Sequence, residues 1–248
     1  MIRAFVTAFG FLTRFPVPQV KSDGRSLGRS LMFFPVAGAA IGGCLTGLAG
    51  LSLLWVSPVV AAFVTVLLWA WVTGGLHLDG LADTFDGLSG GHGDRERTLT
   101  IMRDSRIGSH GTVALVLLLL GKVVLTSELL AADAATALWL VPTAARAAVV
   151  PVVAFFPSAR NEGLGRDLKR NLRPGGVGVA LLLAAGAFAP TRFLLWPCLA
   201  GAFGVALAWA ALLTRRLGGL TGDVYGAVIE VSELAGLAGL LVTLDGPL

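Results

Sequence analysis

The sequence predicts an all-α protein, a polytopic bundle of about seven transmembrane helices that forms one domain over residues 1–248. Three observations predict this fold. Hydrophobic residues make up 55% of the chain, and the mean hydropathy is +0.81. Charged residues make up only 14%, against about 25% in an average soluble domain. Apolar runs long enough to cross a bilayer recur along the chain, and a soluble domain of this length could not bury them all.

The elements follow in order along the chain. Residues 1–18 are amphipathic, and Arg14 and Pro16 stand where a signal-peptide cleavage site would lie, so we expect an uncleaved interfacial segment. Beyond it, about 20 apolar residues are needed for each helix that crosses the hydrocarbon core. The apolar runs predict spans at 31–55, 59–76, 112–131, 135–156, 177–189, 193–213 and 223–244, the fifth closed by Pro190 and Arg192.

The basic residues predict the orientation, because short cytoplasmic loops are enriched in lysine and arginine. If the N-terminus is cytoplasmic, only Arg192 lies outside, and Lys122 and Arg146 lie within spans. The other 16 of the 19 basic residues face the cytoplasm: Arg3, Arg14, Lys21, Arg25, Arg29, Arg95, Arg97, Arg103, Arg106, Arg160, Arg166, Lys169, Arg170, Arg173, Arg215 and Arg216. We therefore predict a cytoplasmic N-terminus and an outside C-terminus.

An acidic motif, His77-Leu-Asp-Gly-Leu-Ala-Asp-Thr-Phe-Asp-Gly87, directly follows the second span. Asp79, Asp83 and Asp86 are spaced i, i+4 and i+7, so on a helix they fall within roughly 60° of one face. Three such carboxylates repel one another, and a divalent cation such as Mg²⁺ or Mn²⁺ resolves the conflict. The alternative is a solvated acidic helix end. His77 could be a base, a ligand or an interfacial polar residue.

A basic motif, Ile101-Met-Arg-Asp-Ser-Arg-Ile-Gly-Ser-His-Gly111, closes the same polar stretch. Arg103 and Arg106 would share one face if the segment is helical, with Asp104 between them. Two guanidiniums beside a metal cluster suit a diphosphate ligand. The alternative is the ordinary enrichment of arginine in cytoplasmic loops.

Ionisable residues also lie within the predicted spans. Asp223, Glu230 and Glu233 fall within roughly 80° of one helix face and form a second acidic stripe that enters the bilayer. Thr221 and Gly222 precede the stripe, and either Thr221 or Asp223 could cap its helix. Arg146 lies in the middle of the fourth span and needs a carboxylate or a polar cavity. A structural salt bridge to one of the glutamates and a role in substrate binding are both open.

Two further charged residues admit more than one interpretation. Lys122 and Glu128 are six residues apart on different helix faces, so we do not pair them; Lys122 either snorkels or neutralises a buried acid. Arg160 and Glu162 lie among glycines in a loop that could cover an anionic substrate, or simply face anionic lipid.

Together these motifs resemble cobalamin synthase, the adenosylcobinamide-GDP ribazoletransferase family. The matching segments run in order through nearly the whole chain: 12–18, 34–38, 77–87, 102–108, Arg146, 159–165 and 220–227. The resemblance implies transfer of the adenosylcobinamide phosphate group from adenosylcobinamide-GDP to α-ribazole or its 5′-phosphate. GMP would leave, and adenosylcobalamin or its 5′-phosphate would form.

The resemblance also implies Mg²⁺ as the cofactor and the cell inner membrane as the location, with the active site facing the cytoplasm. The expected partners are the small-molecule substrates and membrane lipid, with no nucleic acid; a homo-oligomer stays open. For this reaction we expect metal ligation by Asp79, Asp83, Asp86 and Asp223, proton transfer by Asp83 or Asp86, charge stabilisation by Arg103 and Arg106, and substrate contacts from His77, Asp104, Arg146, Arg160, Thr221, Glu230 and Glu233.

Two alternatives remain, one an enzyme with the same chemistry on lipid substrates and one a transporter. A CDP-alcohol phosphatidyltransferase uses a related acidic motif, but that motif needs Ala-Arg where this chain has Asp83-Thr84. A divalent-cation transporter would also carry acidic residues and glycine-rich helices, but it should hold those acids near the bilayer midplane in broken, repeated helices. Here the densest acidic cluster follows the end of a span, so the transferase is favoured.

Overall fold

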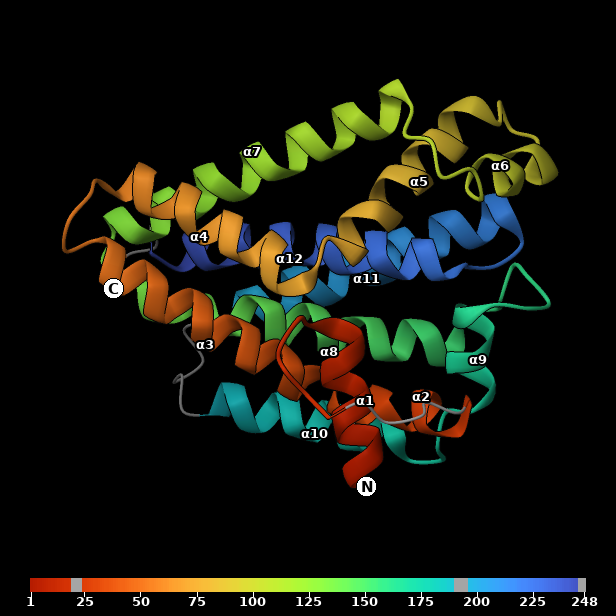
Figure 1. The fold of residues 1–248 in the computed structure, drawn as a ribbon, viewed down its shortest axis with the longest axis horizontal. Helices are drawn as coiled ribbons and strands as arrows, with labels where there is room; N and C mark the ends of the chain where they lie inside the picture. The colour runs from red at the N-terminus through yellow and green to blue at the C-terminus, as the bar shows by residue number, and fades with distance from the viewer. Residues whose placement is uncertain (19–23, 190–195, 245–248) are drawn as a thin grey trace.

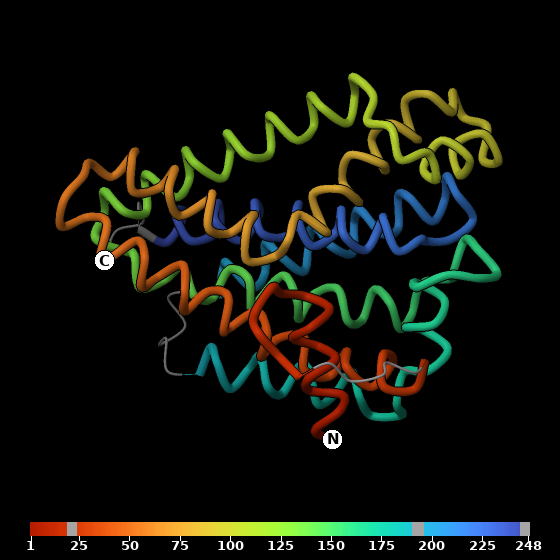
Figure 2. The backbone as a smooth tube through the Cα atoms, in the orientation of Figure 1, coloured from red at the N-terminus to blue at the C-terminus, as the bar shows by residue number. Residues whose placement is uncertain are grey.

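A computed structural model describes residues 1–18, 24–189 and 196–244 of this chain. Three residues used in the topology prediction lie outside the described residues: Lys21, Pro190 and Arg192. The elements are α1 (Ile2–Leu12), α2 (Gly24–Ser30), the 3₁₀ helix η1 (Leu31–Phe33), α3 (Phe34–Ser52), α4 (Pro58–Thr73), α5 (Leu76–Gly90), α6 (Arg95–Ile101), α7 (Ser109–Ala131), the 3₁₀ helix η2 (Ala135–Trp139), α8 (Leu140–Phe155), α9 (Leu164–Arg170), α10 (Gly176–Phe188), α11 (Trp196–Leu217) and α12 (Gly222–Leu244). The longest of them run side by side in one bundle (Figure 1, Figure 2).

The predicted all-α membrane fold is confirmed. Five helical stretches of the described chain are long and apolar enough to cross a membrane, and α4 with α5 would add a sixth if that bent pair counts as one span. Each of the seven predicted spans corresponds to a helix, but α10 has only 13 residues. The count of seven and the orientation therefore stay predictions. α1 lies across the long helices, with Ala4, Ala8 and Leu12 buried (Figure 1).

The second predicted span ends earlier than expected, at Thr73 rather than Leu76. Gly74 and Gly75 have φ of +66° and +71°, a left-handed conformation that glycine adopts without steric cost. The chain turns there by 90°. This bend points α5, which carries the acidic motif, away from α4 and against α12.

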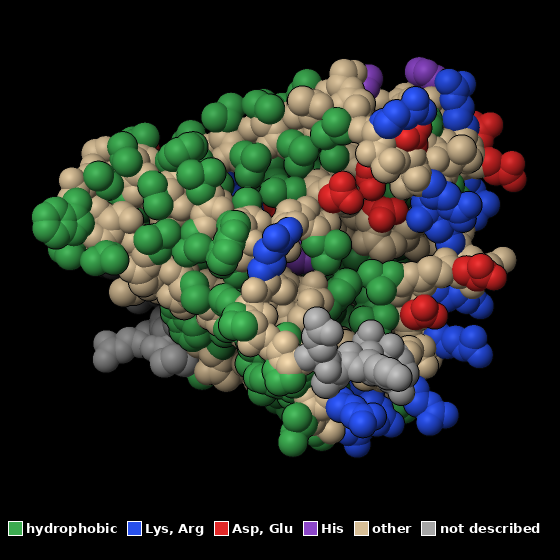
Figure 3. Space-filling view, in the orientation of Figure 1, with side chains coloured by type: hydrophobic (Ala, Val, Ile, Leu, Met, Phe, Trp, Pro, Cys, Tyr) green, Lys and Arg blue, Asp and Glu red, His purple; other side chains and the backbone are tan. Residues whose placement is uncertain are grey.

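The bundle is built around α8, which is buried throughout from Leu140 to Val153 and contacts α3, α10, α11 and α12. Outside this core, large apolar side chains are exposed on α4 and α7, where lipid would cover them. The charged side chains gather at one end of the bundle, around the α5–α6, α8–α9 and α11–α12 connections, whereas apolar side chains dominate the rest of the visible face (Figure 3).

Candidate active site

The carboxylates of the acidic motif lie where α5 crosses α12. A Cβ atom added to Gly80 would come within 2.6 Å of the backbone oxygen of Asp223, so the glycine allows the two helices to touch. Asp83 lies within electrostatic range of Asp79 on its own helix and of Asp223 on α12. Two helices therefore contribute to the acidic cluster, because Asp223, the first residue of the second acidic stripe, joins the motif on α5.

Asp86 has a different environment from the other aspartates. One of its carboxylate oxygens accepts a hydrogen bond from the Gly108 amide at 2.7 Å, and the other accepts one from the Gly111 amide at 2.8 Å. These amides belong to the N-terminus of α7, where a carboxylate is favoured by the unpaired N–H groups and the helix dipole. Asp86 thus anchors the start of α7 to α5. Its predicted roles as metal ligand and base stay predictions.

The donor chemistry of the cluster suits Mg²⁺, which prefers carboxylate oxygens. Asp79, Asp83 and Asp223 supply six such oxygens from two adjoining helices. In the part of the chain that the structure describes, however, no three His, Cys, Asp or Glu side chains converge in a metal-binding arrangement. The residue types fit the ion, and the magnesium site stays a prediction.

Arg160 brings a positive charge to these carboxylates. Its Nη1 lies 3.3 Å from Asp223 Oδ2, and its Nη2 donates to the Leu99 carbonyl at 3.2 Å. The loop that carries Arg160 is joined to the start of α12, because the Ala159 amide donates to the Leu220 carbonyl at 2.9 Å. The structure therefore places Arg160 at the predicted site.

Thr221 caps α12, one of the two capping residues that the sequence left open. Its hydroxyl oxygen accepts from the Val224 amide at 3.3 Å, and its hydroxyl group donates to Asp223 at 3.2 Å. The cap places Asp223 in the first turn of α12, at the edge of the acidic cluster.

Both arginines of the basic motif lie in a loop rather than on a helix. They therefore do not share a helix face, which the sequence predicted only if the segment were helical. α6 ends at Ile101, and α7 begins only at Ser109. Arg106 is 87% exposed and makes an ion pair with Asp104 at 2.6 Å. That guanidinium lowers the pKa of Asp104 to about 2. Arg103 instead lines a groove next to the site, together with Arg160.

The inner part of the acidic stripe forms a buried ion-pair network. Lys122 lies 2.6 Å from Glu230 and also pairs with Glu233, which in turn pairs with Arg146. Trp69 donates its indole N–H to Glu233 at 3.1 Å. Lys122 thus neutralises buried acids, one of the two roles predicted for it. The salt bridge that the sequence left open for Arg146 is present. The predicted substrate contacts of Arg146, Glu230 and Glu233 stay predictions.

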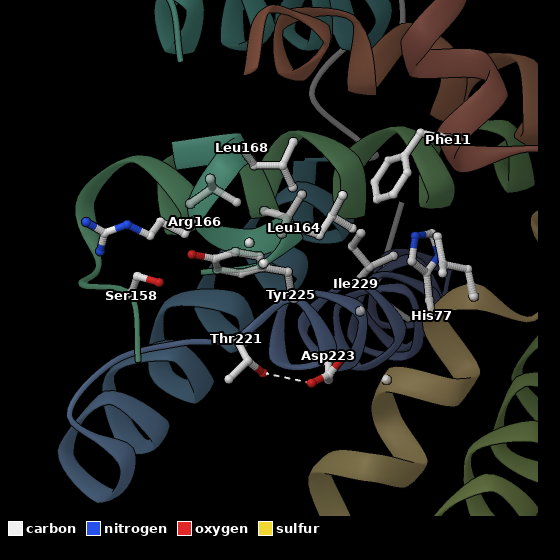
Figure 4. Close-up of a pocket in the computed structure, with 18 of the residues that line it drawn as sticks. Phe11, His77, Ser158, Leu164, Arg166, Leu168, Thr221, Asp223, Tyr225 and Ile229 are labelled. Carbon is white, nitrogen blue, oxygen red and sulfur yellow. Dashed lines mark hydrogen bonds between the residues drawn. The ribbon is translucent and has the colours of Figure 1, made fainter. Parts of the chain in front are cut away.

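A cavity of about 160 Å³, partly open to solvent, lies beside the acidic cluster. Asp79, Arg160 and Asp223 line it together with apolar side chains from α5, α8, α9 and α12. His77, a predicted substrate contact, lines it too, and its Nδ1 lies 3.4 Å from the guanidinium of Arg146. Figure 4 shows His77 and Asp223 facing this space from α5 and α12.

Two residues of this region were missed by sequence reasoning. Trp69 and Tyr225 each lie in an apolar helical run, where a single aromatic residue has no local signal that separates a core role from a functional one. Only the tertiary contacts show that Trp69 holds Glu233 and that Tyr225 lines the cavity.

The comparisons with known proteins agree with the resemblance seen in the motifs. A family model for cobalamin-5-phosphate synthase matches residues 4–241. An adenosylcobinamide-GDP ribazoletransferase of Roseiflexus sp. is 42% identical over 97% of this chain and 89% of its own length. Those of Thiobacillus denitrificans and Pseudomonas syringae pv. syringae are 38% and 42% identical, over 95% and 93% of this chain and 94% and 96% of their own lengths. No solved structure matches the chain. The chain belongs to the cobalamin-5-phosphate synthase family.

Proposed function

We propose that this chain transfers the adenosylcobinamide phosphate group from adenosylcobinamide-GDP to α-ribazole or its 5′-phosphate. GMP is released, and adenosylcobalamin or its 5′-phosphate forms, late in cobalamin biosynthesis. The observation that carries the proposal is that three carboxylates and one guanidinium meet beside a partly open cavity: Asp79, Asp83, Asp223 and Arg160. Family membership supports the same reaction.

In this reaction an alcohol replaces GMP as a substituent on a phosphorus atom. A ribose hydroxyl oxygen of α-ribazole attacks the phosphorus bonded to cobinamide, and the bond from that phosphorus to the GMP oxygen breaks. Asp83 accepts the hydroxyl proton. It is a better candidate for this role than Asp86, whose two oxygens already accept amide hydrogen bonds. Positioning of the two substrates supplies much of the rate enhancement in such a transfer.

The remaining charges suit a diphosphate. Asp79, Asp83 and Asp223 are the residues that would hold Mg²⁺, which when bound neutralises phosphate charge. Arg160 lies beside these carboxylates, and Arg103 lines the neighbouring groove. Both can stabilise negative charge on the leaving GMP. Asp104 holds Arg106 in an exposed ion pair.

We place this site on the cytoplasmic side of the cell inner membrane, with the N-terminus in the cytoplasm. The basic connections that follow α5, α8 and α11 gather at one end of the bundle, together with the acidic cluster (Figure 3). Basic loops of a multi-pass protein stay in the cytoplasm, where nucleotide substrates are available. A reporter fused after Leu248 should therefore read as outside, and a cytoplasmic signal would refute this orientation.

The transferase activity can be tested directly. Purified protein in detergent receives adenosylcobinamide-GDP, α-ribazole and Mg²⁺, and GMP and adenosylcobalamin are measured by chromatography. We expect equal amounts of both products, and no product with a chelator. Asp83→Asn should abolish turnover while the protein elutes as wild type in size-exclusion chromatography. Asp133→Asn, on an exposed turn after α7, is the matched control and should keep full activity. Near-normal GMP release from Asp83→Asn would refute the proposed role of this carboxylate.

A further inference from the structure

Among the described residues that line the cavity beside the acidic cluster, three have a buried polar atom without a hydrogen-bond partner: Tyr225, His77 and Arg160. Tyr225 is 4% exposed and His77 is 3% exposed. The Tyr225 hydroxyl and the His77 Nε2 are both buried without a hydrogen bond. A buried polar group that is left unpaired destabilises the folded state. Because Tyr225 and His77 line the same cavity, a ligand that pairs with them would offset this destabilisation.

The Tyr225 hydroxyl and the His77 Nε2 can both act as donors. The guanidinium of Arg146 has N–H groups and no acceptor, and its Nη2 lies 3.4 Å from His77 Nδ1. His77 Nδ1 is therefore the acceptor, and the proton of the neutral ring sits on Nε2. The Tyr225 hydroxyl can donate to any acceptor that enters the cavity.

Besides Asp79, Arg160, Asp223 and other polar residues, apolar side chains line the cavity. They include Phe11, Val149, Leu164, Leu168 and Ile229. In Figure 4 Leu164 and Leu168 lie beside Tyr225, whereas Phe11 lies near His77, toward the other end of the space. The apolar part of the wall, together with a hydroxyl donor, suits a flat aromatic ring that carries an acceptor nitrogen. The bulky, amide-bearing corrinoid of the other substrate does not suit it.

The helices connect this cavity to the reaction site. Tyr225 lies two residues after Asp223 on α12, and His77 lies two residues before Asp79 on α5. The same two helices therefore supply both the donors and the carboxylates. A base bound in the cavity would leave its ribose near the carboxylates at the edge.

We propose that this cavity binds the aromatic base of the acceptor nucleoside, with the Tyr225 hydroxyl donating to its one free ring nitrogen and His77 Nε2 available to a ribose oxygen. The inference rests on the proposed transferase function and adds to it a specificity-determining residue, Tyr225. α-Ribazole is a benzimidazole riboside, so its ring offers the acceptor nitrogen.

The experiment compares Tyr225→Phe with wild-type protein in detergent, using α-ribazole and an indole riboside that lacks the ring nitrogen. For wild type we expect kcat/KM to be about tenfold lower with the indole riboside, the usual effect of one lost hydrogen bond. Tyr225→Phe should use α-ribazole about tenfold less well and should no longer distinguish the two ribosides. Its KM for adenosylcobinamide-GDP should not change.

Thr126→Val is the matched control, because the Thr126 hydroxyl is also buried without a partner but lies outside this cavity. It should keep the wild-type preference between the ribosides. The inference is overturned if Tyr225→Phe keeps that preference, or if its loss appears in the KM for adenosylcobinamide-GDP. Either of these two results leaves the transferase function standing, as long as the wild-type protein turns over α-ribazole. If wild type forms no product at all, the proposed function and this inference both fail.

Discussion

Glu233 lies at the centre of the buried ion-pair network, where it pairs with Lys122 and Arg146 and accepts a hydrogen bond from Trp69. With Glu230 included, the network holds two cations and two anions and is neutral overall. Glu233→Gln keeps the shape of the side chain but removes one negative charge. The two buried cations then share a single carboxylate, so we expect the folded state to be strongly destabilised.

Removing one partner from a buried ion pair typically costs about 3–5 kcal/mol, because it leaves a buried charge uncompensated. For a chain of this length, each kcal/mol shifts the melting temperature by roughly 2–4 °C. Glu233→Gln should therefore melt some 6–20 °C below wild type on the same scale. Adding Lys122→Met restores the charge balance, so the double variant should be more stable than the sum of the two single effects.

Thermal unfolding of the purified proteins in detergent, followed by circular dichroism, measures these shifts. Glu128→Gln is the matched control, because Glu128 is exposed on α7, and it should melt with wild type. A Glu233→Gln protein that melts within about 2 °C of wild type would refute the structural role. Loss of activity without loss of stability would instead favour the predicted substrate contact.

Two further predictions concern the site. Gly80→Ala should destabilise the protein by about 1–3 kcal/mol, because its methyl would meet the Asp223 carbonyl. Gly178→Ala, with open space around it, should not destabilise the protein. Equal melting temperatures for the two variants would contradict the close crossing of α5 and α12. The folded-state pKa of Asp104, about 2, lies below its ordinary value of 3.8. Its pairing with Arg106 should thus be complete above about pH 4 and lost as pH falls through 2; a midpoint near 4 in a ¹³C NMR titration would refute it.

The helices could be predicted from the sequence because a backbone in lipid has to satisfy its hydrogen bonds within each span. Long apolar runs therefore become helices whatever surrounds them. α7 and α12 begin within three residues of the predicted starts. The turn at Gly74 and Gly75 lay inside a predicted span, since the apolar run continues across it and only its left-handed backbone reveals the bend.

The site could be predicted only in part. The i, i+4, i+7 spacing of the acidic motif is local, so its placement on one helix was within reach of the sequence. The arrangement of Arg103 and Arg106 in the basic motif could not be predicted in the same way. Their shared face depended on a helix that the chain does not form there. Asp86 also looked equivalent to Asp79 and Asp83, and only the position of α7 shows that its oxygens bind amides.

The sequence by itself determined that this is a membrane-embedded helical protein of the cobalamin-5-phosphate synthase family, because composition, apolar runs and short motifs are properties of neighbouring residues. The tertiary structure alone decided which charges meet. Lys122 and Glu230 are separated by 108 residues, and their pairing depends on how α7 and α12 pack. The same packing leaves the hydroxyl of Tyr225 unpartnered inside a cavity, since a side chain's partners are set by the helices around it.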